Sequence, residues 1–223
     1  MTSPALWYAT RATGIVALVL FTATVGLGAL TASRVQSHAW PGFAQQELHR
    51  RVSLLAIAFL GVHIATSVLD SFVHIGWVAV VVPFTSRYKT AWVGVGTVAF
   101  DMMQAVALSS LLRHRIPATA WRSVHWLGYL SWPVALAHGI AIGTDGSEPW
   151  VRWLTVACVA TVAAAAAARA LVTARWRRAA VAAAPAPVVP TTRLVARASR
   201  SALATAAVIA ASAGPGASQR RSP

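Results

Sequence analysis

Long apolar runs constrain this chain most strongly, because several of them are long enough to cross a lipid bilayer. A helix needs about 20 mostly apolar residues to span about 30 Å of hydrocarbon. Five runs meet that requirement: 15–32, 49–69, 91–112, 120–142 and 150–172. Apolar residues make up 57% of the chain and charged residues 11%, which excludes an ordinary soluble domain. We therefore expect an all-α integral membrane protein, a bundle of about five transmembrane helices.

The chain divides into two parts by composition. Residues 1–174 contain all five apolar runs and are expected to form one membrane domain. Residues 175–223 are rich in Ala, Pro and Arg without periodicity, so we expect a disordered cytoplasmic tail. The apolar stretch 70–87 contains Gly76 and Pro83 and suits an interfacial segment better than a span.

The charge of the chain points to lipid rather than to nucleic acid. The formal net charge is +14, yet the arginines lie in short loops and in the tail, not in a patch with interleaved aromatic residues. We interpret them as topology determinants and contacts to lipid headgroups, and expect no nucleic-acid partner. The single cysteine, Cys158, excludes a disulfide or an iron–sulfur cluster within one chain.

Loop charges predict the orientation. Arginines are concentrated before the second span, between the third and fourth spans, and after the fifth, whereas the 143–149 loop is net acidic. The positive-inside rule then predicts a multi-pass protein of the cell membrane, with its N-terminus outside and its C-terminus in the cytoplasm. The second and fourth spans would both run from inside to outside.

Histidines mark both of these parallel spans. His49 and His63 are fourteen residues apart, and His125 and His138 are thirteen residues apart. Either spacing corresponds to roughly 20 Å along a helix. Because the two spans are expected to be parallel, His49 should lie level with His125, and His63 level with His138. A single histidine near a helix end is usually an interfacial residue, but two matched pairs inside membrane spans favour a functional site.

Two imidazoles that face each other at one depth can ligate an iron from both sides. Such an iron is six-coordinate and low-spin, and it suits the transfer of single electrons. We therefore expect two haem b groups, with His49 and His125 as metal ligands of one and His63 and His138 of the other. Haem carboxylates need cationic partners at the membrane faces. Candidates are Arg50, Arg51 and Arg122 at the inner face, and Arg87 and Lys89 at the outer face, although ordinary anchoring explains each of these equally well.

Two residues within the spans leave alternatives open. Thirteen residues would turn His138 away from His125 on an ideal helix, and Pro133 between them is expected to kink or unwind the turn. Asp101 could hydrogen-bond a ligand histidine, serve a proton path, pair with Gln104, or face a water-filled crevice.

With these residues in view, residues 5–172 resemble the ferric reductase-like transmembrane domain family. That family includes membrane domains of NADPH oxidases, ferric reductases and the haem-binding subunit of bacterial methionine sulfoxide reductase systems. The paired histidines carry the resemblance, supported by Leu48-His49-Arg50, Trp121-Arg122-Ser123-Val124-His125 and Pro83-Phe84. It implies an inner haem b on His49 and His125, and an outer haem b on His63 and His138.

The chain departs from the oxidases because it contains no flavin or nicotinamide domain, and no Gly-x-Gly-x-x-Gly after a strand. As an oxidoreductase component it would need a separate donor reductase or quinol, and an external electron acceptor. Two other classes remain: a haem-free transporter or proton-conducting protein that uses Asp101 and the histidines, and a membrane anchor subunit.

Overall fold

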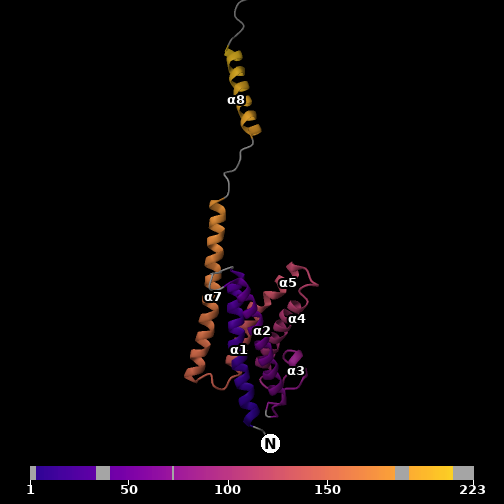
Figure 1. Cartoon of the computed structure of the whole chain (residues 1–223). Coiled ribbons are helices and arrows are strands. Elements are labelled where there is room, and N and C mark those ends of the chain that lie inside the picture. Colours follow the sequence, from indigo (N-terminus) through magenta and orange to yellow (C-terminus); the bar gives the residue numbers. More distant parts are fainter. Residues whose placement is uncertain (1–3, 34–40, 72, 184–190, 213–223) are drawn as a thin grey trace, which may run out of the picture. The chain divides into compact units, whose positions relative to one another are not determined.

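The computed structural model describes residues 4–33, 41–71, 73–183 and 191–212, and the regular structure in these ranges is entirely helical (Figure 1). The helices are α1 (Pro4–Ala32), α2 (Gly42–Leu69), α3 (Val78–Val81), α4 (Thr90–Leu111), α5 (Ala118–His125), α6 (Leu127–Ile142), α7 (Pro149–Ala182) and α8 (Thr191–Ser212).

Four of the described helices, α1, α2, α4 and α7, are long and apolar enough to cross a membrane. On α2, large apolar side chains such as Leu54, Leu55 and Val62 are about half exposed. Extensive exposure of aliphatic side chains along a long helix is expected where the surrounding solvent is lipid. The predicted all-α, multi-pass membrane architecture is confirmed.

The fourth expected span is divided rather than continuous. It begins as α5, is interrupted at Trp126, and continues as α6. At the interruption the Tyr129 N–H donates to the Trp126 carbonyl three residues earlier, at 3.0 Å. Pro133, the expected cause of an irregularity, lies inside α6 instead. A residue in a 3₁₀ turn rotates by about 120° rather than about 100°, so the tight turn at Trp126 supplies part of the rotation that the thirteen-residue spacing lacks.

Prolines mark four of the helix starts in the described ranges. Pro41 and Pro117 precede α2 and α5, and Pro4 and Pro149 are the first residues of α1 and α7. Proline is favoured there because the first helical N–H groups have no partner within the helix.

Helix α1 is central to the membrane part. It packs along α2 on one side and against α6 on another, while α4 packs on α6 and α5, and α3 packs on α4. Among the described helices, α2 packs closely on α1 rather than on α6. Space therefore remains between the two histidine-bearing segments.

A buried apolar cluster joins α1, α6 and α7 near the middle of this bundle. It consists of Phe21, Val25, Trp132, Leu136 and Cys158. The Trp132 indole N–H donates to the Thr22 hydroxyl at 2.9 Å, so the one polar atom of that buried ring is satisfied. Trp132 lies between His125 and His138 in the sequence, and the cluster therefore separates the levels of the two histidine pairs.

The tail contains more helix than we expected. The chain divides into two compact units, Met1–Trp176 and Arg177–Pro223, close to the expected boundary at residues 174–175. Helix α7 continues beyond this boundary to Ala182, and α8 occupies Thr191–Ser212. Both stretches are alanine-rich, and alanine has the highest helix propensity, which our reading of the composition underestimated. Residues 184–190 and 213–223 of the expected tail lie outside the described residues.

Candidate functional site

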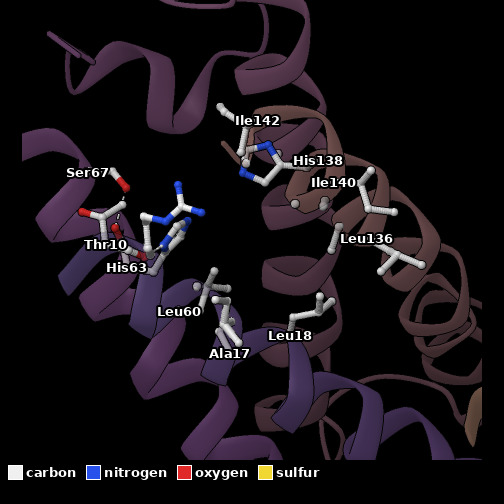
Figure 2. Close-up of a pocket in the computed structure, with 18 of the residues that line it drawn as sticks. Thr10, Ala17, Leu18, Leu60, His63, Ser67, Leu136, His138, Ile140 and Ile142 are labelled. Atoms are coloured by element: carbon white, nitrogen blue, oxygen red, sulfur yellow. Dashed lines mark hydrogen bonds between the residues drawn. The ribbon is translucent and has the colours of Figure 1, made fainter. Parts of the chain in front are cut away.

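A cavity of about 610 Å³ lies at one end of the histidine pairs, and both His63 and His138 line it. Figure 2 shows these two rings on opposite sides of the open space, one from α2 and one from α6. Most of the lining is apolar and includes Leu18, Leu60 and Leu136. An apolar cavity with a few convergent polar groups is the usual form of a cofactor site.

Both of these imidazoles are fixed by a backbone carbonyl. His63 Nδ1 lies 2.8 Å from the Thr10 oxygen, and His138 Nδ1 lies 2.7 Å from the Trp92 oxygen. A carbonyl can only accept a hydrogen bond, so Nδ1 must carry the proton and donate it. The lone pair of each neutral ring is then on Nε2, and this is the arrangement in which histidines commonly bind metals.

The other two histidines form a second pair at the opposite ends of the same segments. The ring centroids of His49 and His125 are 6.4 Å apart, and the ring planes are inclined by 66°. A ligating ring nitrogen lies about 2.0 Å from the metal and about 1.1 Å from the centre of its own ring. Two imidazoles on opposite sides of one metal therefore have ring centroids about 6.2 Å apart, close to the 6.4 Å between His49 and His125. His49 Nδ1 lies 3.1 Å from the Thr24 oxygen, so its tautomer is fixed in the same way.

A glycine makes room for each of these three fixed rings. The acceptors Thr10, Thr24 and Trp92 each precede a glycine by four residues: Gly14, Gly28 and Gly96. A Cβ at Gly14 would lie 2.8 Å from His63 Nδ1, and a Cβ at Gly28 would lie 3.3 Å from His49 Cε1. At Gly96 the corresponding distance to His138 Nδ1 is 2.5 Å. At Gly14 and Gly96 a Cβ would displace the ring, and at Gly28 it would make a tight contact with it.

Sequence reasoning missed these glycines, although a signal was present. Thr10 and Thr24 are fourteen residues apart, and so are Gly14 and Gly28, which matches the separation of His49 and His63. A repeat at the histidine spacing on the neighbouring helix indicates two equivalent contacts along antiparallel helices.

His125 is held differently from the other three histidines. Its ring stacks on Trp121, with the two ring centroids 4.8 Å apart. The Arg113 guanidinium lies over the Trp121 ring, 4.6 Å from its centroid. His125 Nδ1 is buried and makes no hydrogen bond within the described part of the chain. Stacking, rather than a carbonyl, orients this imidazole.

The basic residues expected at the inner face are exposed. Arg50 and Arg51 are about three-quarters exposed and contact Glu47, at 3.9 and 2.7 Å. Arg122 is also exposed. These positions suit lipid headgroups, as the alternative interpretation of the sequence held.

At the other face, Arg87 and Lys89 are exposed and do not line the cavity. The Lys89 ammonium donates to the Ile142 carbonyl instead. The cationic residues that do line the cavity are Arg11 and Arg152, which sequence reasoning did not select. Arg11 forms an ion pair with Asp145 and a hydrogen bond to Thr144, which ties the start of α1 to the loop after α6.

Asp101 and the loop histidines His74 and His114 are not part of either pair. Asp101 does not line the cavity and makes no hydrogen bond with Gln104 or a ligand histidine within the described residues. His74 and His114 are exposed in loops. His38 lies outside the described residues.

The donor sets fit haem better than a bare metal ion. Within the described ranges no group of three or more His, Cys, Asp or Glu side chains could hold a metal. A haem iron takes four nitrogens from its macrocycle and needs only two protein ligands, which is what each pair offers. A flat macrocycle also requires apolar space beside the ligands, and the cavity between His63 and His138 provides it.

Comparison of the chain with family models, curated proteins and solved structures gives no match. The interpretation of the site therefore depends on the histidine spacing and on the geometry described above.

Proposed function

We propose that this protein binds two haem b groups and carries single electrons across the membrane. The observation that supports this most directly is the presence of two facing imidazole pairs at opposite ends of the same two helical segments. Along a helix the two levels are roughly 20 Å apart, a large part of the hydrocarbon core.

In this proposal the protein supplies ligands, orientation and a dry interior. His49 and His125 hold one group, and His63 and His138 hold the other. The carbonyls of Thr10, Thr24 and Trp92 keep three of the imidazoles in the tautomer that leaves Nε2 free. An iron with two imidazole ligands, once bound, supplies reversible one-electron chemistry without an open coordination position.

We further propose the orientation that the loop charges favour, with the His49–His125 pair on the cytoplasmic side. Electrons would then enter from a cytoplasmic flavoprotein or from quinol and leave toward an external acceptor. In this proposal the chain acts as a component of an oxidoreductase, with a separate donor and acceptor.

The test is the visible spectrum of the full chain purified in detergent after expression with ample haem. We expect low-spin haem b bands that sharpen on reduction by dithionite, with one haem for each histidine pair by pyridine haemochrome assay. A protein that is folded but colourless would contradict the proposal and would favour a haem-free transporter or an anchor subunit.

A further inference from the structure

Arg169 is a cation within the apolar helix α7, and it has no acidic partner. It lies in the stretch of α7 that is long and apolar enough to span a membrane. Among the described residues, no carboxylate lies within ion-pair distance of its guanidinium. A charged side chain in such a segment is costly and usually serves a function.

The guanidinium turns toward aromatic residues of the bundle rather than outward to an interface. It donates to the Tyr129 hydroxyl at 2.8 Å and lies 4.9 Å from the Trp126 ring centroid and 5.5 Å from that of Tyr129. A guanidinium has five N–H donors, so one hydrogen bond leaves most of them available. Tyr129 and Trp126 therefore position a guanidinium whose remaining N–H groups have no acceptor among the described residues.

These donors lie beside the His49–His125 pair. The Tyr129 hydroxyl and the His49 ring both approach Gly28 on α1, at 3.9 and 3.3 Å from the position of a Cβ at that glycine. Tyr129 is also one turn along the chain from His125, across the tight turn at Trp126. Arg50 and Arg51 contact Glu47 instead, and the Arg113 guanidinium lies over Trp121.

We propose that Arg169, positioned by Tyr129 and Trp126, binds a carboxylate of the haem held by His49 and His125. This inference depends on the proposed function, and it assigns an anion-binding residue that is not among the basic residues selected from the sequence. Planar guanidinium and carboxylate groups form paired hydrogen bonds, and charge-assisted bonds of this kind are the strong ones. The negative charge of the carboxylate would then neutralise the positive charge of Arg169 within the apolar helix.

The experiment compares haem loss from the full chain in zwitterionic nanodiscs, with apomyoglobin as the acceptor. Apoprotein is loaded either with haem or with haem dimethyl ester, which has no carboxylates. Arg169→Gln is compared with wild type, with Arg169→Lys, and with Arg175→Gln as a matched control on an exposed site of the same helix. His63→Ala, which leaves the His49–His125 pair intact, identifies the phase of haem loss that belongs to that pair.

With haem, we expect Arg169→Gln to lose the His49–His125 haem at least about tenfold faster, as the loss of a charged hydrogen bond predicts. The lysine variant should lie between, and Arg175→Gln should match wild type. With the dimethyl ester, wild type and Arg169→Gln should lose haem equally fast. Midpoint potential provides a second readout: Arg169→Gln should lower the potential of the haem held by this pair, because removal of a nearby positive charge disfavours reduction of the iron, whereas Arg175→Gln should leave it unchanged.

Three outcomes would overturn the inference. Equal haem loss from wild type and Arg169→Gln would exclude a bond to the carboxylate. A difference that persists with the ester would indicate a structural role, and a difference that appears only in nanodiscs with anionic lipid would indicate a lipid phosphate. A wild-type chain that binds no haem would instead contradict the proposed function itself.

Discussion

At the scale of single residues, the four histidines are not equivalent. His49, His63 and His138 each donate from Nδ1 to a helix carbonyl, whereas His125 is stacked on Trp121. A donor bond to a carbonyl makes the opposite nitrogen a stronger ligand and fixes the ring plane. In the His49–His125 pair, a hydrogen bond to a carbonyl therefore orients His49, whereas only stacking on Trp121 orients His125.

Pairwise ligation can be tested by removal of single imidazoles. His63→Ala and His138→Ala should each abolish the same haem, and His49→Ala and His125→Ala should each abolish the other, because six-coordinate low-spin iron needs both rings. Haem content should fall by half in every variant, and the residual reduced spectra should match within each pair. Matching spectra for His49→Ala and His138→Ala would contradict the pairing.

At the scale of helices, α1 and α4 act as supports for the ligand-bearing segments. α1 supports both histidines of α2 through Gly14 and Gly28, and α4 supports His138 through Gly96. A helix that touches an imidazole over a glycine fixes the ring through backbone atoms, which move little compared with side chains. The supporting helices thus define the ligand positions more rigidly than the ligand-bearing helices alone.

Glycine-to-alanine substitutions should separate this role from general packing. Gly96→Ala and Gly14→Ala place a methyl group within 3 Å of a fixed ring, so we expect loss of haem from the His63–His138 pair. Gly61→Ala on α2 is the matched control, because no atom lies within 4 Å of a Cβ there and Gly61 does not line the cavity. Alanine favours a helix by about 1 kcal/mol over glycine, so the control should retain haem and gain thermal stability.

Loss of haem in Gly96→Ala and retention of haem in Gly61→Ala are the expected results. Equal retention of haem by all three variants, measured by pyridine haemochrome, would show that the rings do not depend on the glycines.

The helix level also shows what the sequence could predict. Hydrophobicity and length predict the spans because both follow from the thickness of the bilayer, and the histidine spacing predicts the two levels. The break at Trp126 instead of Pro133 depends on how α5 and α6 pack on α4, and spacing alone does not contain that information. Arg169 was not selected from the sequence because its aromatic partner Tyr129 is forty residues away. It also lies in a stretch whose other residues are mostly apolar.

At the scale of the whole molecule, the arrangement is an insulated pair of sites with differently charged ends. The buried apolar cluster around Trp132 and Phe21 lies between the two levels. The loop end near His125 carries exposed arginines, among them Arg113, Arg115 and Arg122, whereas the loop after α6 carries Asp145 and Glu148. Such an asymmetry favours an acidic partner at the His49–His125 end.

The difference in charge between the two ends should affect the rate at which a separate donor reduces the haem. The isolated chain should not oxidise NADH or NADPH, because nicotinamide donates a hydride and low-spin haem accepts one electron at a time. Haem reduction should require an added flavoprotein reductase, and its rate should fall as ionic strength rises from about 0.01 M to about 0.15 M, over which the Debye length shrinks from about 30 Å to about 8 Å.

Stopped-flow spectroscopy of the haem band, with and without a reductase and across this range of salt, measures both effects. Arg113→Gln with Arg115→Gln should weaken the salt dependence, since these exposed charges would steer the encounter, and Arg87→Gln at the opposite end serves as the matched control. Direct reduction by a quinol analogue would shift the donor to the lipid phase. Rapid NAD(P)H oxidation by the chain alone would contradict the need for a separate donor.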